Sequence, residues 1–316
     1  MYSMLFLGTI GAGGIFAGTN PGYTPYELVH HIRTADVKYL ITEPEALQSI
    51  LAAAKECNIS KSNILIFNVN GQPVPQGFQS WDTLLDKGKD DWLRFDNLQT
   101  AKDTEAVRLF SSGTTGLPKA TMISHYNLVA QHTICWNVDR KDYDVRRLLC
   151  LPMFHAAVFP VAHTTTLKAG HASYVLRRFK LEGFLQTIEN YQITDLIMVP
   201  PIVIATIMSD LTDKYSLKSL RAAVCGAAAL GIGPQKRFQQ LMSANAPFTQ
   251  VWGERPGRIF HDKTDPVAGM TELSCLATRH PYPEHDDTGS IGRALPNIDT
   301  KCVYHPVVLC KPTLTF

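Results

Sequence analysis

The segment VRLFSSGTTGLPKATMISHYNL, residues 107–128, decides how the rest of the chain is interpreted. Its apolar, strand-like beginning leads into a stretch where hydroxyls and glycines are concentrated: Ser111, Ser112, Gly113, Thr114, Thr115 and Gly116, followed by Lys119. Glycine lets backbone N–H groups approach a ligand closely, hydroxyls are short hydrogen-bond donors, and lysine adds a point charge. The stretch therefore predicts a strand that ends in a turn able to wrap a polyphosphate.

This turn differs from a Walker A loop. The Walker pattern requires Gly-Lys-Ser/Thr, whereas Lys119 follows Pro118 and precedes Ala120. Gly and Ser are also default turn residues, so composition alone leaves open a solvated turn between two strands.

Short apolar runs alternate with helix-like stretches along the chain. Their length and continuous apolarity predict strands at 37–42, 63–69, 106–112, 146–153, 172–176, 195–200 and 219–226. Helices are predicted at 24–35, where Thr24 and Glu27 have the spacing of a capping box, and at 45–57 and 181–192. Residues 72–81 are predicted to be loop and residues 87–105 polar linker. Apolar strands separated by helices predict an α/β fold of mostly parallel sheets with helices on both faces.

Composition excludes several classes of protein. Of the 316 residues 45% are hydrophobic and 18% charged, and the formal net charge of +2 predicts no attraction to nucleic acid. The apolar residues 1–18 are fewer than the roughly 20 that span a bilayer, so we expect a buried helix or strand–turn and no stable membrane insertion. Seven cysteines without a Cys-x-x-Cys pair indicate a reducing, cytoplasmic compartment.

The sequence SSGTTGLPKA followed by SHYNL resembles the signature loop of the adenylate-forming superfamily, which includes acyl-CoA synthetases. Residues 6–32 are similar to the matching stretch of 4-coumarate–CoA ligase-like enzymes, especially fungal ones. The likeness covers roughly 4–253 and 269–303 and implies the AMP-binding large domain of that fold. It also implies ATP, Mg²⁺ and coenzyme A as cofactors, with Ser111 to Gly116 and Lys119 binding the phosphates of ATP.

Further motifs of that family follow in order along the chain. The resemblance assigns His155, in LPMFHAAVF, to a position between the carboxylate pocket and the thiol channel. In GMTELS it implies that Thr271 donates to the α-phosphate and Glu272 holds Mg²⁺, an ion that prefers oxygen ligands. Adenine would lie against the small residues of VCGAAALG, and Trp252 and Gly253 would line the acyl and adenine pockets. The positions matching the adenine loop are Gly226, Ala227 and Ala228.

Each of these motifs has a plainer alternative when it is taken alone. His155 could be a hydrogen-bonded core histidine, and residues 224–231 could be a strand end that turns into a helix. The Gly-x-Thr-Glu pattern is short, and its place in the series makes it specific. The segment DTGSIGRALPN, residues 287–297, is expected to begin a small β-barrel subdomain and to be structural.

The resemblance implies chemistry in two steps. A carboxylate, from an aryl or fatty acid, attacks the α-phosphorus of ATP and releases pyrophosphate, and a thiol then attacks the acyl-adenylate. Because like charge gathers on the phosphates, the protein must supply Mg²⁺, N–H groups and cations. No Gly-x-Ser-x-Gly nucleophile motif occurs in the chain, as expected for a reaction without a nucleophilic side chain.

Three departures from the family pattern shape the expectation for activity. The chain starts after several strands and helices of the family pattern and stops before the ribose-binding Asp, the following Arg and the C-terminal lid domain with its adenylation lysine. Between Gly253 and Met270, residues 254–269 are polar and aperiodic, and we interpret them as an insertion from a retained in-frame intron. The chain as written is therefore expected to be truncated at both ends and inactive or crippled.

The expected organisation has three parts: residues 1–145 with the phosphate loop, 146–286 with the carboxylate and adenine pockets and the insertion, and 287–316 with the start of the barrel and an aberrant tail. Two alternatives stay open, a non-catalytic product of a truncated gene model and an adenylation domain that loads a carrier protein. The tail ends in Leu314-Thr315-Phe316, without the peroxisomal address of many relatives. The acid and the oligomeric state are undetermined by the sequence.

Overall fold

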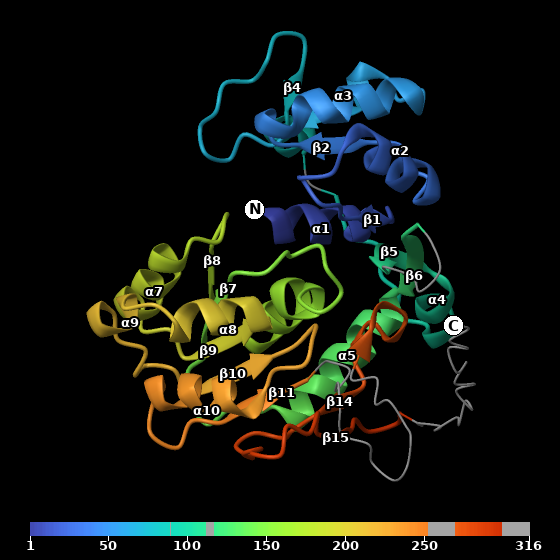
Figure 1. The fold of residues 1–316 in the computed structure, drawn as a ribbon. Coiled ribbons are helices and arrows are strands. Elements are labelled where there is room, and N and C mark those ends of the chain that lie inside the picture. The colour runs from blue at the N-terminus through green and yellow to red at the C-terminus, as the bar shows by residue number, and fades with distance from the viewer. Residues whose placement is uncertain (89, 112–116, 252–268, 299–316) are drawn as a thin grey trace, which may run out of the picture.

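A five-stranded parallel sheet, in the order β11-β10-β9-β7-β8, organises the larger part of the molecule (Figure 1). The structure is a computed structural model that describes residues 1–88, 90–111, 117–251 and 269–298. The strands of this sheet are β7 (Arg146–Leu149), β8 (Ala172–Val175), β9 (Asp195–Met198), β10 (Ala222–Cys225) and β11 (Phe248–Gln250).

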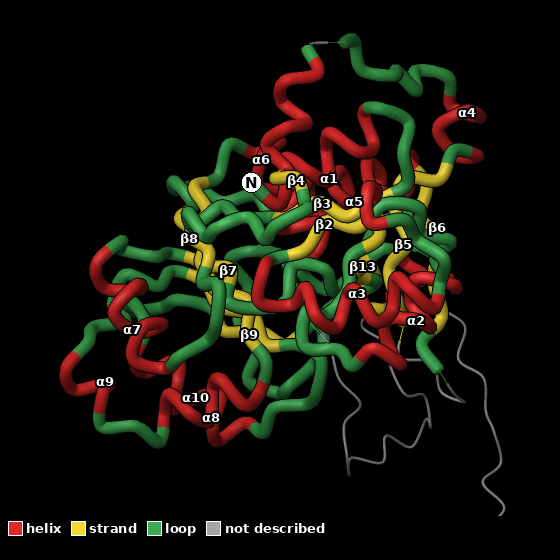
Figure 2. The backbone as a smooth tube through the Cα atoms, turned by 90° about the horizontal axis from the view of Figure 1, so that it is seen from above, coloured by secondary structure: helices red, strands yellow, loops and turns green. Residues whose placement is uncertain are grey.

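Helices cover both faces of this sheet because most residues on both sides of its strands are apolar. The helices that follow the strands cover one face of the sheet (Figure 2). Leu196, Met198, Ala223 and Cys225 belong to the apolar core beneath them. These helices are α7 (Leu181–Asn190), α8 (Pro200–Ile207), α9 (Leu211–Lys214) and α10 (Ile232–Leu241). The alternate residues of β9 and β10 face the other layer. That layer contains α5 (His125–Val138), the π-helical turn η4 (Val161–Thr165) and α6 (Thr166–Ala169).

A second sheet carries the glycine-rich segment. Its strands are β1 (Phe16–Ala17), β5 (Glu105–Ser111) and β6 (Lys119–Ser124). β1 and β5 are parallel, whereas β5 and β6 form an antiparallel hairpin whose last pair joins Ser111 and Lys119. Helix α1 (Tyr2–Gly11) packs its buried Phe6 against Phe159 in the core beneath this sheet.

A third body holds the parallel strands β2 (Leu40–Thr42), β3 (Ile64–Ile66) and β4 (Gln79–Ser80). Helices α2 (Pro25–Thr34) and α3 (Leu47–Glu56) pack against each other and share its apolar core. The predicted capping box is confirmed, because the Thr24 N–H donates to Glu27 and the Glu27 N–H donates to the Thr24 hydroxyl. Short 3₁₀ turns complete the body at η1 (Pro44–Ala46), η2 (Lys61–Asn63) and η3 (Trp81–Lys87).

The remaining described elements are short and lie beyond β11. They are β12 (Gly269–Met270), the 3₁₀ turn η5 (Thr271–Leu273), β13 (Cys275–Leu276), β14 (Thr278–Arg279) and β15 (Arg293–Ala294). β12 pairs with β13 and β14 with β15, both antiparallel. Gly269 belongs to β12, whereas 254–268 of the predicted insertion and the tail from residue 299 onward lie outside the described residues.

The α/β prediction with mostly parallel sheets is confirmed, and every predicted strand overlaps an observed one. Two local predictions were wrong. The linker 87–105 contains α4 (Leu98–Asp103), which Asn97 caps by accepting from the N–H groups of Gln99 and Thr100, and the loop 72–81 contains β4. Short capped helices of this kind lack the long apolar period that the prediction required. Among the described residues, no helix is both long and apolar enough to cross a membrane.

Candidate functional site

The hairpin that carries the glycine-rich segment and the turn that carries the Thr-Glu pair lie side by side. Both β5 and β6 pack against η5, although more than 140 residues separate this turn from either strand in the sequence. The strands that flank the predicted phosphate turn and the turn with the predicted metal ligand thus share one region of the molecule (Figure 1).

At the hairpin end, Ser111 and Lys119 stand opposite each other as the last pair of the ladder. The Ser111 hydroxyl oxygen is buried and has no hydrogen-bond partner among the described residues, which is costly for a polar atom unless a ligand or water completes it. The Lys119 side chain is exposed. Residues 112–116, predicted to bind phosphate, lie outside the described residues.

On η5, Thr271 and Glu272 differ in their surroundings. Thr271 is buried, at 6% exposure, whereas Glu272 is exposed. The Ser274 N–H donates to the carbonyl of Thr271 and closes the turn, with Ser274 in the left-handed region at φ 64°. The turn therefore presents a carboxylate to solvent beside the hairpin.

The carboxyl edge of the five-stranded sheet gathers the other predicted residues. His155 lies just beyond β7, and Gly226, Ala227 and Ala228 directly follow β10. Ligands of open α/β sheets bind at this edge, where the strands stop and loops diverge. Trp252 and Gly253, which would follow β11, lie outside the described residues.

His155 is exposed on one side and held by its own loop. Its Nδ1 accepts a hydrogen bond from the Ala157 N–H at 3.2 Å, so in the neutral ring Nε2 carries the proton. Partial loss of hydration lowers the pKa of His155, which favours that neutral ring. The plainer alternative, a histidine buried in the core, does not describe this residue. His163, by contrast, is fully buried between Ser3 and the Met153 carbonyl.

The loop after β10 leaves small residues open to a ligand. The Gly226 N–H donates to the Met198 carbonyl at 2.9 Å, which ties the loop to β9. Ala227 and Ala228 are exposed, and Ala227 adopts a φ of 66°, a region that costs a residue with a Cβ about 1–2 kcal/mol. Non-glycine strain of this kind concentrates at functional loops.

A pair of buried glutamines, which the sequence reasoning missed, fixes the far end of this loop. Gln250 accepts from the Leu230 N–H and donates to the Leu230 carbonyl, each at 3.0 Å, and also donates to Gln235 at 2.8 Å. Gln235 donates in turn to the carbonyls of Phe248 and Asp286. A polar side chain at the end of an apolar strand is the signal that could have identified Gln250.

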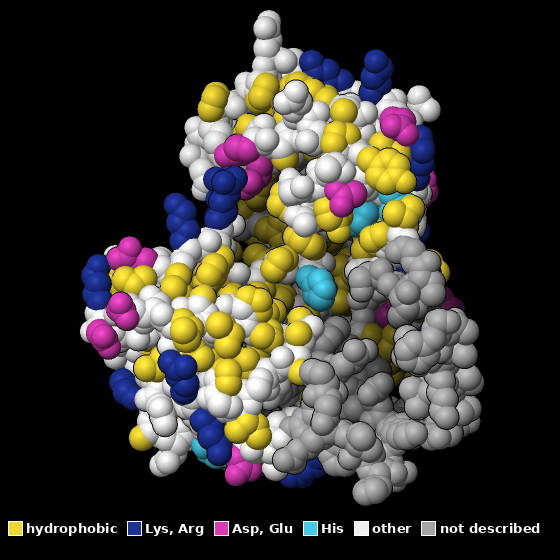
Figure 3. Space-filling view, viewed as in Figure 1, with side chains coloured by type: hydrophobic (Ala, Val, Ile, Leu, Met, Phe, Trp, Pro, Cys, Tyr) yellow, Lys and Arg dark blue, Asp and Glu magenta, His cyan; other side chains and the backbone are white. Residues whose placement is uncertain are grey.

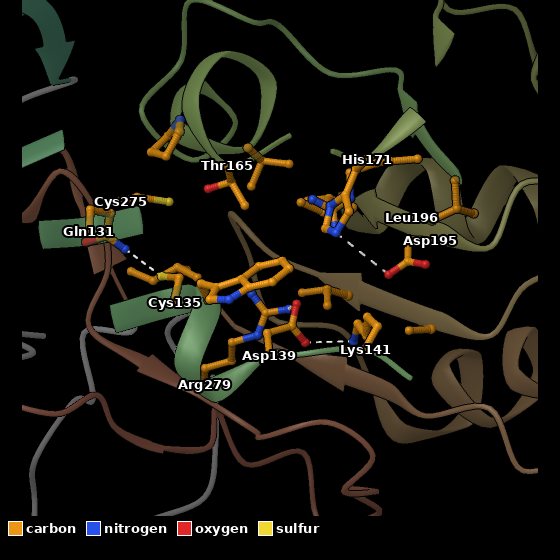
Figure 4. Close-up of a pocket in the computed structure, with 18 residues that line it drawn as sticks. Gln131, Cys135, Asp139, Lys141, Thr165, His171, Asp195, Leu196, Cys275 and Arg279 are labelled. Atoms are coloured by element: carbon orange, nitrogen blue, oxygen red, sulfur yellow. Dashed lines mark hydrogen bonds and ion pairs between the residues drawn. The ribbon is translucent and has the colours of Figure 1, made fainter. Parts of the chain in front are cut away.

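A small cavity of about 40 Å³ lies between α5, η4 and the sheet (Figure 4). Its apolar wall includes Val161, Val224 and Leu276. Val224 lies two residues before Gly226, and Leu276 lies four after Glu272. The cavity therefore borders both the adenine-loop motif and the Thr-Glu motif.

The other wall of the cavity is a buried ion network. Asp139 pairs with Lys141 at 2.7 Å and with Arg279, and Arg147 faces Asp195 at 3.7 Å. Burial alone would raise the pKa of Asp139, but the charges of Arg279 and Lys141 hold it below its usual value. The network joins the end of α5 to β7, β9 and β14, and its primary effect is to fix these elements together.

The surface is hollowed between the α2–α3 body and the part built on the five-stranded sheet (Figure 3). Apolar atoms dominate the floor of the hollow in that view. Arg177, after β8, bridges the two parts by pairing with Glu43 at 2.8 Å and Glu45 at 2.9 Å. Ion pairs that are so exposed to water contribute little free energy to folding. Their main effect is therefore to orient the two parts of the molecule rather than to stabilise the protein.

The chain is similar to proteins of a known family. A family model described as AMP-binding enzyme matches residues 2–255. An acyl-CoA synthetase of Alternaria alternata is 46% identical over 96% of this chain and 50% of its own length, and a phenylacetyl-CoA ligase of Aspergillus niger is 46% identical over 96% and 54%. The chain spans about half the length of the curated relatives it matches.

Two solved structures share the fold. The ATP-bound MatB of Rhodopseudomonas palustris aligns with a TM-score of 0.70 at 24% identity, covering 93% of this chain and 52% of that one. A long-chain-fatty-acid–CoA ligase of Archaeoglobus fulgidus aligns with a TM-score of 0.76 at 20% identity, covering 93% and 55%. With the matched sequence model and these relatives, the chain belongs to the family of AMP-binding enzymes.

Proposed function

We propose that this chain binds ATP and a carboxylic acid and forms an acyl-adenylate, which the thiol of coenzyme A converts to a thioester. The observation that carries the proposal is the packing of η5, with Thr271 and Glu272, against both strands of the β5–β6 hairpin. A single nucleotide reaching from the hairpin to η5 can then contact both motifs. Family membership and relatives named as CoA ligases support the same reaction.

The phosphates would be bound at the hairpin end. Ser111 has a buried hydroxyl whose hydrogen-bonding capacity is unused among the described residues, and Lys119 adds a positive charge opposite it. Residues 112–116 would supply further N–H and hydroxyl donors, and Thr271 would donate to the α-phosphate. These groups would stabilise the negative charge that grows on the α-phosphate during attack.

A magnesium ion fits this region through Glu272. Its carboxylate is exposed next to the hairpin, and Mg²⁺ commonly uses one or two protein carboxylates while substrate phosphates and water complete its shell. When bound, the ion would neutralise part of the charge on the phosphates.

Adenine would lie on the exposed Ala227 and Ala228 beside Gly226, with Trp252 and Gly253 near by. The acid would place its carboxylate near His155 and extend its tail toward the cavity that Val161 and Val224 line. At about 40 Å³ this space admits a few water molecules, so an aryl or fatty tail requires the surrounding side chains to move apart. The ligand would thus span the carboxyl edge of the sheet.

The proposed reaction balances in two displacements. A carboxylate oxygen bonds to the α-phosphorus as the bond to the bridging oxygen breaks and pyrophosphate leaves. The thiolate sulfur of coenzyme A then bonds to the acyl carbon and AMP leaves. The neutral His155, with its Nε2–H directed away from the loop bond, would stand where acid and thiol meet.

Isotope exchange tests the proposal. The 316-residue chain, with ATP, Mg²⁺ and either phenylacetate or octanoate, is expected to incorporate labelled pyrophosphate into ATP, in contrast to the inactive or crippled product expected from the sequence alone. Ser111→Ala and Lys119→Ala are expected to slow this exchange at least tenfold, with Lys55→Ala, an exposed position on α3, as the control. The proposed function would be wrong if the wild-type chain showed neither acid-dependent exchange of pyrophosphate nor thermal stabilisation by ATP.

A further inference from the structure

Two consecutive histidines of α2 contact the two ends of the glycine-rich turn. His30 reaches Pro118 on the β6 side, and His31 reaches Phe110 on the β5 side. We propose that His30 and His31 are positioning residues, which hold the ends of β5 and β6 in the relative position that nucleotide binding requires. The inference rests on the proposed function for its nucleotide readout.

The His30 contact is a defined hydrogen bond. Its Nε2 lies 2.7 Å from the Pro118 carbonyl oxygen, and a carbonyl only accepts, so Nε2 carries the proton. The other nitrogen, Nδ1, lies 3.5 Å from the Thr34 hydroxyl one helical turn later, which can donate to it. Pro118 directly precedes Lys119, the first residue of β6, so the bond restrains the point where the turn rejoins the sheet.

The His31 contact is a stacked pair of rings. Its imidazole lies on Phe110 with ring centroids 3.5 Å apart and planes 14° from parallel, and Tyr23 meets the same imidazole edge-on at 4.9 Å. Nδ1 lies 3.0 Å from the Thr19 hydroxyl. The residue is buried, at 5% exposure, and Phe110 directly precedes Ser111. The stack therefore restrains the point where the turn leaves the sheet.

A third contact fixes the helix along the strand. The Arg108 guanidinium donates to the Ala35 carbonyl at 2.6 Å, at the end of α2, and is held in place by Glu105. Within the α2–α3 body, Leu28, Val29 and Ile32 anchor α2 in the core. A shift of this body would therefore move both ends of the hairpin together, because His30 and His31 belong to a helix that cannot move independently.

Hydrogen exchange, measured without any nucleotide, tests whether His30 and His31 restrain the two ends of the hairpin. In the 316-residue chain, amides in peptides covering 106–124 are expected to exchange several-fold faster in His30→Ala and His31→Ala than in wild type. His30→Gln, which keeps a donor of similar reach, and His31→Phe, which keeps the stack, are expected to restore slow exchange. Tyr26→Ala is the matched control, since Tyr26 lies on the same helix and is 71% exposed.

Nucleotide affinity is the second readout. His30→Ala is expected to raise the KM for ATP about fivefold, the effect of losing one neutral hydrogen bond, with kcat changed less than twofold. The proposal would be overturned if the amides of both alanine variants exchanged at the wild-type rate. It would also be overturned if they exchanged equally fast in Tyr26→Ala. If the wild-type chain binds no ATP, the proposed function fails, whereas the exchange measurement still decides the inference.

Discussion

Gly18 lies directly against Phe154, the residue before His155. A Cβ on Gly18 would stand 2.7 Å from the Phe154 Cβ and 2.9 Å from the Tyr2 hydroxyl oxygen, closer than such atoms can come. Gly18→Ala is therefore expected to destabilise the protein by about 1–3 kcal/mol and to displace the His155 loop. Gly233→Ala is the control, because nothing lies within 4 Å of that Cβ and alanine favours the helix. Urea unfolding of both variants measures the difference in stability. Equal urea midpoints would contradict the close packing of Gly18 against Phe154.

Gln250 satisfies both backbone groups of Leu230 inside the protein. Gln250→Leu leaves that N–H and carbonyl buried without partners, so we expect a loss of about 2–4 kcal/mol in the free energy of unfolding. Gln240→Leu, on the exposed side of α10, is expected to change it by less than about 0.5 kcal/mol. Chemical denaturation followed by tryptophan fluorescence checks both values.

Ala227 carries backbone strain that glycine would relieve. Ala227→Gly is expected to raise the free energy of unfolding by about 1 kcal/mol, because glycine adopts a φ of 66° without steric cost. The neighbouring Ala228→Gly, whose φ is negative, is expected to lower it by about 0.5–1 kcal/mol. Thermal unfolding of the two variants gives opposite shifts if the strain is real and shifts of the same sign if it is not.

Stability is expected to fall in mild acid because of buried histidines. Burial, and next the charge of His30, lowers the pKa of His31 to about 4, against roughly 6.5 when unfolded. Between these values the unfolded chain binds a proton that the folded chain does not, so stability is fully present above about pH 6.5 and is lost as pH falls toward 4.

Burial also lowers the pKa of His163 to about 4, which adds to this acid sensitivity. Urea midpoints at pH 7.5, 6 and 5 measure the decline in wild type and in His31→Phe. The variant keeps the ring on Phe110 and is expected to lose less stability over this range. An identical pH slope in the two proteins would exclude His31 as a contributor.

Removal of the Glu272 carboxylate is expected to separate metal binding from folding. Because Glu272 is exposed, Glu272→Gln is expected to leave the unfolding temperature of the free protein within about one degree of wild type. The additional stabilisation by ATP when Mg²⁺ replaces EDTA is expected to shrink by at least half. Asp287→Asn, also exposed, is the control. An undiminished effect of Mg²⁺ in Glu272→Gln would remove this residue from the metal site.

Much of the fold was predictable because its strands are short, apolar and separated by helical periods. The capping box at Thr24 and Glu27 was predictable for a similar reason, since it depends on residues within one turn. Helix α4 was missed because it is only 6 residues long and its polar sequence has no apolar period. Of the predicted site, Ser112 to Gly116, Trp252 and Gly253 lie outside the described residues, so their roles stay predictions.

The sequence by itself determined the family and the order of the motifs, because the hydroxyl- and glycine-rich turn and the Gly-x-Thr-Glu pattern are local strings of residues. Only the tertiary structure decided that η5 packs beside the β5–β6 hairpin and that His30 and His31 meet the two ends of the turn. These contacts join segments far apart in the chain, and their partners are a proline carbonyl and a phenylalanine ring that no local pattern distinguishes. Non-local contacts of this kind depend on how the separate sheets and their helices pack against one another.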